Sequence, residues 1–373
     1  MSAFVILLVI LSASCMTEGA RTPALGEIVV AKASYESLSA VAPEEVAIRC
    51  LDTAGWPTCD QLRPSAATLQ GPSTLIVDRS SLFRLSGDGH VSRIGGTGDG
   101  PGELRAPIAI GVDPGDRVVV YDVRRARIIR YSADTLLDEQ QLLPPRYMRE
   151  MYMRSGDLFV FVLPPGATRG DSVSASVVRI RTDALGAMDT VATFRARSNA
   201  GAGDGATFTP RLPWEPTHIW DACPDGSIVV ASTDHWRVSR YRMSGSAVAI
   251  VSRQNSAKPA SAAERESVFA AWIERSPRVP AFREGLKARF PEMPNRPPMV
   301  DRIVCEGPDA ALLRNYPLPS ERSARWDRVH DSRGVTASYT LPSDAELVAS
   351  DGQVGLLLRM NDDGPSLARL RWR

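Results

Sequence analysis

The sequence has no excess of charge of either sign, and only three of its basic residues are lysines. Its 373 residues include 44 basic and 43 acidic side chains, which gives a formal net charge of +1 at pH 7. Without a basic excess the chain has little charge with which to neutralise a phosphate backbone, so nucleic-acid binding is disfavoured. Hydrophobic residues make up 43% of the chain, too many for a disordered polymer. The composition indicates a folded protein of two or three domains, or one large all-β array.

An unbroken hydrophobic run, Phe4–Leu11, is followed by three small residues and then Cys15. The run is too short to span a bilayer but suits the core of a signal peptide. Small residues directly before a cysteine resemble a bacterial lipoprotein signal. We therefore predict a signal peptide over residues 1–15, with Cys15 lipidated, and a linker over residues 16–26. The alternative is a secretory signal that is cut near Ser14 or Ala20. Either predicts export, to the cell envelope as a lipoprotein or to the periplasm or exterior, with membrane contact only through the lipid.

Six tetrapeptides spaced along the chain share the form hydrophobic–any–Arg–hydrophobic. Their arginines are Arg84, Arg130, Arg179, Arg240, Arg328 and Arg369, separated by 46, 49, 61, 88 and 41 residues. A period of 40–50 residues is typical of a four-stranded propeller blade. A β-rich run lies upstream of each tetrapeptide, and Gly- or Asp-containing turn signals precede five of these runs. The repeats therefore predict six blades, each with four strands and with the arginine on the third strand.

The segment Ile94–Leu104 contains a Gly-Pro-Gly-Glu loop, and Val120-Tyr121-Asp122 and Arg127-Ile128 follow it. This arrangement resembles NHL-type six-bladed β-propellers of bacterial exported proteins, most clearly over residues 70–135. The resemblance implies a protein, peptide or glycan partner without choosing among them. A phosphate-binding loop is excluded, because the Lys-Ser/Thr ending is missing and a strand follows the glycines. We predict an all-β fold, a six-bladed β-propeller over residues 27–373.

The last blade shows only three strands, and an open sheet edge invites aggregation. The hydrophobic run at residues 27–31 is the predicted fourth strand, paired with residues 366–371 to close the ring.

The longest gap between arginines contains a helical pattern. A capping box at Ser261–Glu264 precedes hydrophobic residues at helical spacing. We predict a short helical insertion, residues 257–296, between blades four and five. About 30 residues cannot bury a core of their own, so the insertion should pack over blades four and five. There it should form one wall of a cleft over the central channel, near His218 and Asp301.

Four cysteines remain once Cys15 is set aside, an even number in a chain bound for an oxidising compartment. Cys50 and Cys59 are close enough to form a small disulfide loop. Cys223 and Cys305 occupy the same repeat position, at the end of the first strand of neighbouring blades. A disulfide there requires Cα atoms within about 7 Å, and the sequence leaves that bond open. A structural zinc site is disfavoured, since the histidines are scattered and neither pair has two-residue spacing.

Every long connection falls on one face of the predicted propeller, and binding residues concentrate in such loops. Charged side chains at the starts of the first strands should face the channel mouth on this side. They are Arg149, Glu150, His218, Asp301 and Glu346. This mixture suits ligand binding, general acid–base chemistry or a metal, but a water-filled mouth is also polar without function. The sequence lacks Gly-x-Ser-x-Gly and His-Glu-x-x-His motifs, so no catalytic residue is assigned.

Asp78, Asp122 and Asp234 end the second strand of their blades. A ring of carboxylates could hold Ca²⁺. The alternative, which we favour, is that each aspartate accepts hydrogen bonds from nearby turn N–H groups. No other cofactor is expected.

The resulting hypothesis is an exported scaffold that binds a protein, peptide or glycan through its long-loop face. The alternative is a metal-dependent hydrolase or lyase with its site at the channel mouth, and a third option is a structural component of the envelope.

Overall fold

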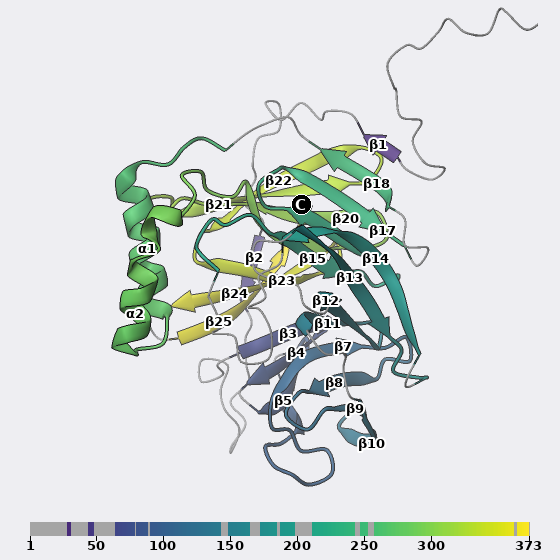
Figure 1. Ribbon diagram of the computed structural model, residues 1–373. Helices are drawn as coiled ribbons and strands as arrows, with labels where there is room; N and C mark the ends of the chain where they lie inside the picture. The colour runs from purple at the N-terminus through teal and green to yellow at the C-terminus, as the bar shows by residue number, and fades with distance from the viewer. Residues whose placement is uncertain are drawn as a thin grey trace, which may run out of the picture.

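The computed structural model describes residues 28–30, 44–47, 64–78, 80–88, 90–142, 148–164, 172–184, 187–197, 211–242, 247–252, 257–361 and 364–372. These residues form an all-β, six-bladed propeller with two α-helices (Figure 1). In each blade, strands that follow one another along the chain pair in antiparallel fashion.

The blades are as follows. Blade one contains β3 (Pro64–Gln70), β4 (Ser73–Asp78), β5 (Ser81–Leu85) and β6 (Val91–Gly95); blade two contains β7 (Pro107–Val112), β8 (Val118–Asp122), β9 (Arg127–Ser132) and β10 (Thr135–Gln141); blade three contains β11 (Met148–Arg154), β12 (Asp157–Val162), β13 (Ser172–Ile180) and β14 (Met188–Arg197). Blade four contains β15 (His218–Ala222), β16 (Ile228–Ser232), β17 (Arg237–Tyr241) and β18 (Ala247–Ser252); blade five contains β19 (Val300–Cys305), β20 (Ala310–Asn315), β21 (Ser323–His330) and β22 (Gly334–Pro342); blade six contains β23 (Ala345–Ser350), β24 (Val354–Asn361), β25 (Gly364–Arg371) and β2 (Glu44–Ala47).

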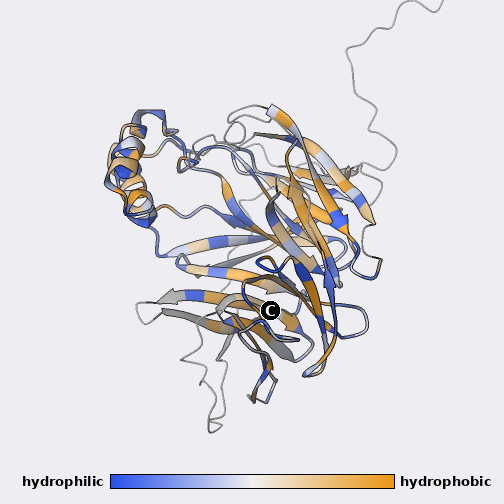
Figure 2. Ribbon diagram, turned by 60° about the horizontal axis from the view of Figure 1, so that its bottom comes forward, coloured by the Kyte–Doolittle hydropathy of each residue, from blue (hydrophilic) through white to orange (hydrophobic). Residues whose placement is uncertain are grey.

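The innermost strands form a continuous ring, because each contacts its counterpart in the next blade and β23 contacts β3. Hydrophobic side chains fill the space between neighbouring sheets. Between blades one and two, for example, Leu75 and Val120 are both fully buried in one cluster. Figure 2 shows hydrophobic residues along the strands and hydrophilic residues mainly in the connections. The core is therefore six inter-blade layers around the axis.

The six repeat arginines all lie on the third strand of their blades, as predicted. Tight turns after the first and third strands lie on one side of the ring, here called the turn face. The connections between blades, and those between second and third strands, lie on the opposite side, here called the loop face. The longer connections, such as those between β14 and β15 and between β18 and β19, belong to the loop face.

The prediction for residues 27–31 is wrong. Strand β1 (Ile28–Val30) pairs in parallel with β18 on blade four, and β2 pairs in antiparallel fashion with β25 on blade six. The strand beside β25 must lead into the innermost strand of blade one, and β2 is much nearer to β3 along the chain. The hydrophobic run of β1 instead covers the outer edge of blade four.

Two helices, α1 (Ala262–Arg275) and α2 (Pro280–Lys287), and a 3₁₀ turn, η2 (Phe290–Glu292), follow β18 and precede β19 in the chain. The predicted capping box is present at the start of α1. In both views the helix pair stands to one side of the sheets (Figures 1 and 2). Within the described part of the chain, none of the helices is long and apolar enough to cross a membrane.

Helix α1 packs onto the propeller through its hydrophobic stripe. Phe269 and Ile273 are buried in one cluster with Leu212 and Trp214, in the connection that enters blade four. The Trp214 indole Nε1 donates a hydrogen bond to the hydroxyl of Tyr316, which follows β20, at 3.0 Å. The prediction that this stripe is buried by packing is confirmed. An isolated helix of this length would be marginal in water, so this packing stabilises α1.

A disulfide joins Cys223 to Cys305, with 2.04 Å between the sulfurs and 5.3 Å between the Cα atoms. It links the ends of β15 and β19, as the equivalent repeat positions of these cysteines allowed. Cys15, Cys50 and Cys59 lie outside the described residues.

Candidate functional site

Charged side chains from three blades meet at the channel mouth on the loop face. Glu150 lies on β11, Arg302 on β19 and Glu346 on β23. The Arg302 guanidinium Nη2 is 3.3 Å from Glu346 Oε1, and Arg302 also acts electrostatically on Glu150. The side chains of Arg302 and Glu346 are 49% and 41% exposed, so this pair is open to a ligand. These three residues are called the mouth triad below.

A less exposed ion pair supports the mouth triad. Arg314 on β20 donates to both carboxylate oxygens of Asp301, at 2.8 and 2.6 Å. It also donates to the carbonyl oxygen of Ala345, the residue before Glu346, at 3.2 Å. Burial acts to lower the pKa of Arg314, but its contacts with Asp301 outweigh this effect and the pKa is raised. Bidentate geometry of this kind fixes orientation, so Asp301 positions the neighbouring strand rather than meeting a ligand directly.

The protonation of Glu150 is shifted by its surroundings. Its side chain is exposed to water, yet nearby protein displaces part of its hydration and raises its pKa; the Trp220 indole and the charges of Arg211 and Arg302 oppose the rise. Burial likewise lowers the pKa of Arg211, against the effect of Glu150. Such perturbed groups in a cavity mouth are typical of binding or catalytic sites. Glu150 is therefore a candidate ligand-binding residue at the mouth.

Sequence reasoning missed Arg211 and Arg302. Arg302 follows the predicted Asp301 directly, and strand alternation assigns neighbouring residues to opposite sides. The register of β19 shifts between Val300 and Arg302, and such an irregularity re-aims side chains. Arg211 lies in a long connection, where the sequence carries no periodic signal. Its direct neighbour Leu212 is buried with α1, which places Arg211 between the helices and the mouth.

Two other predicted mouth residues do not join the triad. His218 is the first residue of β15, but its ring is 5.3 Å from that of Phe194 on blade three. Among the described residues, the charge that acts on the pKa of His218 is that of Asp234. The prediction that His218 faces the channel with the other charges is therefore corrected: its side of the strand packs between blades three and four. The side chain of Arg149 lies outside what the structure describes, although its backbone belongs to β11.

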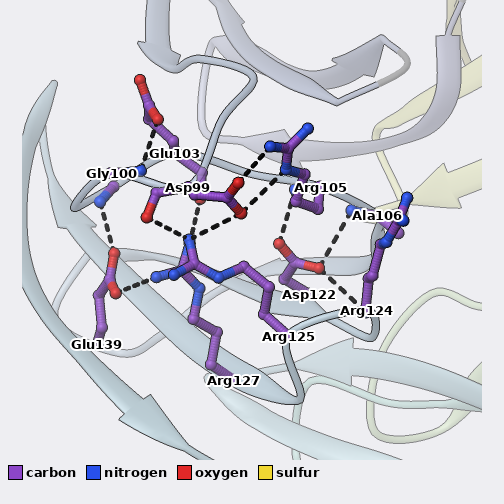
Figure 3. A network of polar contacts seen from close by, with 11 residues as sticks. Asp99, Gly100, Glu103, Arg105, Ala106, Asp122, Arg124, Arg125, Arg127 and Glu139 are labelled. Carbon is purple, nitrogen blue, oxygen red and sulfur yellow. Dashed lines mark hydrogen bonds and ion pairs between the residues drawn. The ribbon is translucent and has the colours of Figure 1, made fainter.

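Asp122 has the structural role that we favoured. Its carboxylate accepts hydrogen bonds from the backbone N–H groups of Arg105, Ala106 and Arg124, at 2.8, 3.1 and 3.2 Å (Figure 3). The neighbouring glycine-rich loop is also held by protein groups, since Gly102 donates its N–H to Glu139 at 2.5 Å. Gly102 has a φ of 70°, in the left-handed region that favours glycine. Hydrogen bonds from other parts of the protein therefore hold this loop in place.

The other two aspartates do not form a ring with Asp122. Asp234 is exposed and faces His235 Nδ1 at 3.3 Å. The buried Oδ1 of Asp78 has no hydrogen-bond partner among the residues that the structure describes. Among the described residues, no three His, Cys, Asp or Glu side chains lie close enough to hold a metal ion together. The Ca²⁺ hypothesis therefore finds no ligand set in this part of the chain.

Comparisons with known proteins support the fold alone. No protein family matches the sequence, and no curated protein does. A solved structure of a predicted exported protein from Bacteroides fragilis is similar, with 11% identity, a TM-score of 0.50, and coverage of 92% of this chain and 97% of that one. A DUF4221 family member from Bacteroides vulgatus has 8% identity and a TM-score of 0.54, with 90% and 98% coverage. The architecture is thus shared over nearly the whole length of these chains.

Proposed function

We propose that this protein is an exported binding scaffold that holds a protein, peptide or glycan at the mouth of its central channel. The observation that carries the proposal is the mouth triad: three water-accessible charges from three different blades, backed by the Asp301–Arg314 pair. A ligand with both hydrogen-bond donors and acceptors can satisfy all three at once. Binding residues commonly lie on loops that a rigid scaffold such as a propeller holds around a concave surface.

The helical insertion between blades four and five belongs to the proposed site. Arg211 acts on Glu150 and is joined to Leu212, which packs with α1. The insertion would thus form one wall of the binding surface. An NHL-type identity is part of the same proposal, and it rests on the residues of the glycine-rich loop and the strand that follows.

Export is supported by three independent features. The hydrophobic run before Cys15 suits a signal peptide, the Cys223–Cys305 disulfide suits an oxidising compartment, and a structurally similar protein is a predicted exported protein. Lipidation of Cys15 would place the propeller at a membrane surface.

The test compares partner capture by three variants, with purified protein immobilised against peptide and glycan libraries. Arg302→Ala with Glu346→Ala removes the exposed pair at the mouth. Arg181→Ala with Asp183→Ala removes another exposed Arg–carboxylate pair, at 2.9 Å, on the turn face and is the matched control. We expect the mouth variant to lose its ligands by tenfold or more, a scale set by about 1.4 kcal/mol, and the control to keep them.

Deletion of residues 257–296 is the second arm. It should abolish binding while leaving the β-rich circular dichroism intact. If both the mouth variant and the deletion retain full binding, the loop face is not the binding surface.

A second candidate is a metal-dependent hydrolase or lyase at the same mouth. The raised pKa of Glu150 favours it, since a carboxyl whose pKa is shifted upward is a better candidate for a general acid than an ordinary carboxylate. Metal analysis of the purified protein distinguishes the two functions: stoichiometric Ca²⁺ or Zn²⁺ would favour the enzyme.

A further inference from the structure

A second hollow lies away from the channel mouth, between blades three and four. Its volume is about 370 Å³, within the range of small-molecule sites. Its lining includes Phe194 and Arg195 from β14 of blade three, and His218, Val230, Ser239 and Arg237 from blade four. No member of the mouth triad lines it. This hollow is called the inter-blade cleft below.

The strand register of blade four builds the floor of the cleft. His218 pairs with Ser232 and Ser232 pairs with Arg237, which makes one row across β15, β16 and β17. Val230 pairs with Ser239 in the next row of the same face. Cross-strand partners project to the same side of a sheet. The floor therefore has one polar row toward the loop face and a more apolar row below it.

The aromatic ring of Phe194 encloses the cleft from the side of blade three. The ring of Phe194 lies 5.3 Å from that of His218 and 6.0 Å from that of Tyr241. Rings at these distances pack against one another and also offer flat faces to an apolar ligand. The cleft can hold a hydrophobic or aromatic group between Phe194 and the blade-four floor.

Unsatisfied polar groups point to a polar ligand head. Among the described residues, the buried Nδ1 of His218 has no hydrogen-bond partner, a state that costs free energy unless something pairs with it. Burial lowers the pKa of His218, so its ring is neutral near pH 7. In the described part of the chain, the exposed guanidinium of Arg237 makes no hydrogen bond or ion pair. Arg237 is therefore open to a ligand that enters the cleft, and the buried Nδ1 of His218 belongs to a residue that lines it.

The charges of the lining favour a negative ligand. Arg195 and Arg237 are both cationic, and Arg195 uses one N–H for the carbonyl oxygen of Ser172, at 3.2 Å. The single acid, Asp234, is already engaged by Ser232 and faces His235. An amine would meet two like charges, and a neutral sugar would leave Arg237 unpaired.

We propose that the inter-blade cleft binds a small carboxylate with a hydrophobic or aromatic body. The carboxylate pairs with Arg237 at the rim, where arginine and carboxylate match in geometry and charge. The body lies between Phe194 and Val230, with His218 Nδ1 beside the head group. This site is separate from the mouth triad and would operate whether or not the mouth binds a partner.

The test measures affinity of the full-length protein for phenylacetate, 4-phenylbutyrate and octanoate, each beside its uncharged amide and with glucose as a neutral sugar. Titration calorimetry gives the affinities, and the ¹H–¹⁵N signals of the His218 ring report where the ligand binds. We expect at least one carboxylate to bind with a Kd below about 1 mM, ten or more times more tightly than its amide, and to shift the His218 signals.

Arg237→Gln should weaken that carboxylate about tenfold, the scale of one charge-assisted hydrogen bond. Arg242→Gln, an exposed arginine just beyond the end of the same strand, should change its affinity less than twofold. The proposal is overturned if no carboxylate binds below about 1 mM, or if acid and amide bind equally. It is also overturned if glucose binds in place of the acids, or if both arginine variants behave alike.

Discussion

The Nε atom of Arg240, on the third strand of blade four, lies 2.6 Å from the carboxylate of Asp331, in the turn after the third strand of blade five. The same relationship recurs around the ring. Arg84 pairs with Asp134 in the corresponding turn of blade two, at 2.8 Å, and Arg130 donates to the carbonyl oxygen of Thr182 in blade three. Arg84, Arg130 and Arg240 therefore each link neighbouring blades at the turn face.

Replacing Arg240 with Met should destabilise the protein by about 2–4 kcal/mol, because Asp331 would lose its partner in a largely buried site. The side chain of Arg240 is only 1% exposed, and it also donates to Ser227 Oγ and the carbonyl oxygen of Ala310. Denaturant unfolding measures the change. Arg242→Met removes an exposed arginine two residues later and should stay within about 0.5 kcal/mol of the wild type. Equal effects of the two substitutions would show that Arg240 does not stabilise the contact between blades four and five.

The Cys223–Cys305 disulfide should contribute about 2–4 kcal/mol to stability, since it closes a loop across 82 residues. The double variant Cys223→Ser and Cys305→Ser should unfold at correspondingly lower denaturant concentration. Alkylation of the unreduced wild type should leave both residues unmodified. Labelling of both cysteines without reduction would show that the bond does not form.

Strand β2 should protect the outer edge of β25 in blade six. Two truncations test this: one lacks residues 1–43 and the other lacks residues 1–47, so both lack β1 and only the second lacks β2. The second should expose an unpaired edge, lose stability by on the order of 1–3 kcal/mol relative to the first, and associate in light-scattering measurements. Identical behaviour of the two proteins would mean that β2 is not needed at this edge.

Glu150 should make the stability of the protein fall as pH rises through its folded-state pKa. That pKa is raised above the ordinary value of 4.5, chiefly because nearby protein displaces part of the hydration of the carboxylate, so folding favours the protonated form. Its contribution is complete below pH 4.5 and is lost above the raised pKa. Relative to Glu150→Gln, the wild type should lose unfolding free energy as the pH rises above 4.5. Urea unfolding at a series of pH values measures this loss. A carboxyl ¹³C titration of Glu150 is the direct check, and a midpoint below 4.5 would contradict the prediction.

The sequence by itself determined the blade count and the placement of the arginines. A 40–50-residue spacing, β-rich runs and turn residues are local signals, and each reports on the few residues around it. Arg84 and Arg369 therefore lie on the third strands of their blades, as predicted. The capping box of Ser261 with Glu264 likewise predicted the start of α1, because capping depends only on residues within one helical turn.

Tertiary structure alone decided which distant groups meet. Residues 28–30 and 44–47 are both short strands, and the choice between them at β25 depends on the path of the chain to blade one. Cys223 and Cys305 occupied equivalent positions, but only the geometry of adjacent inner strands brings their Cα atoms to 5.3 Å. Arg302 lies beside Glu346, and His218 lies beside Phe194, because strand register and inter-blade packing set the direction of a side chain. These are contacts across many residues, and one chain's local periodicity carries no information about them.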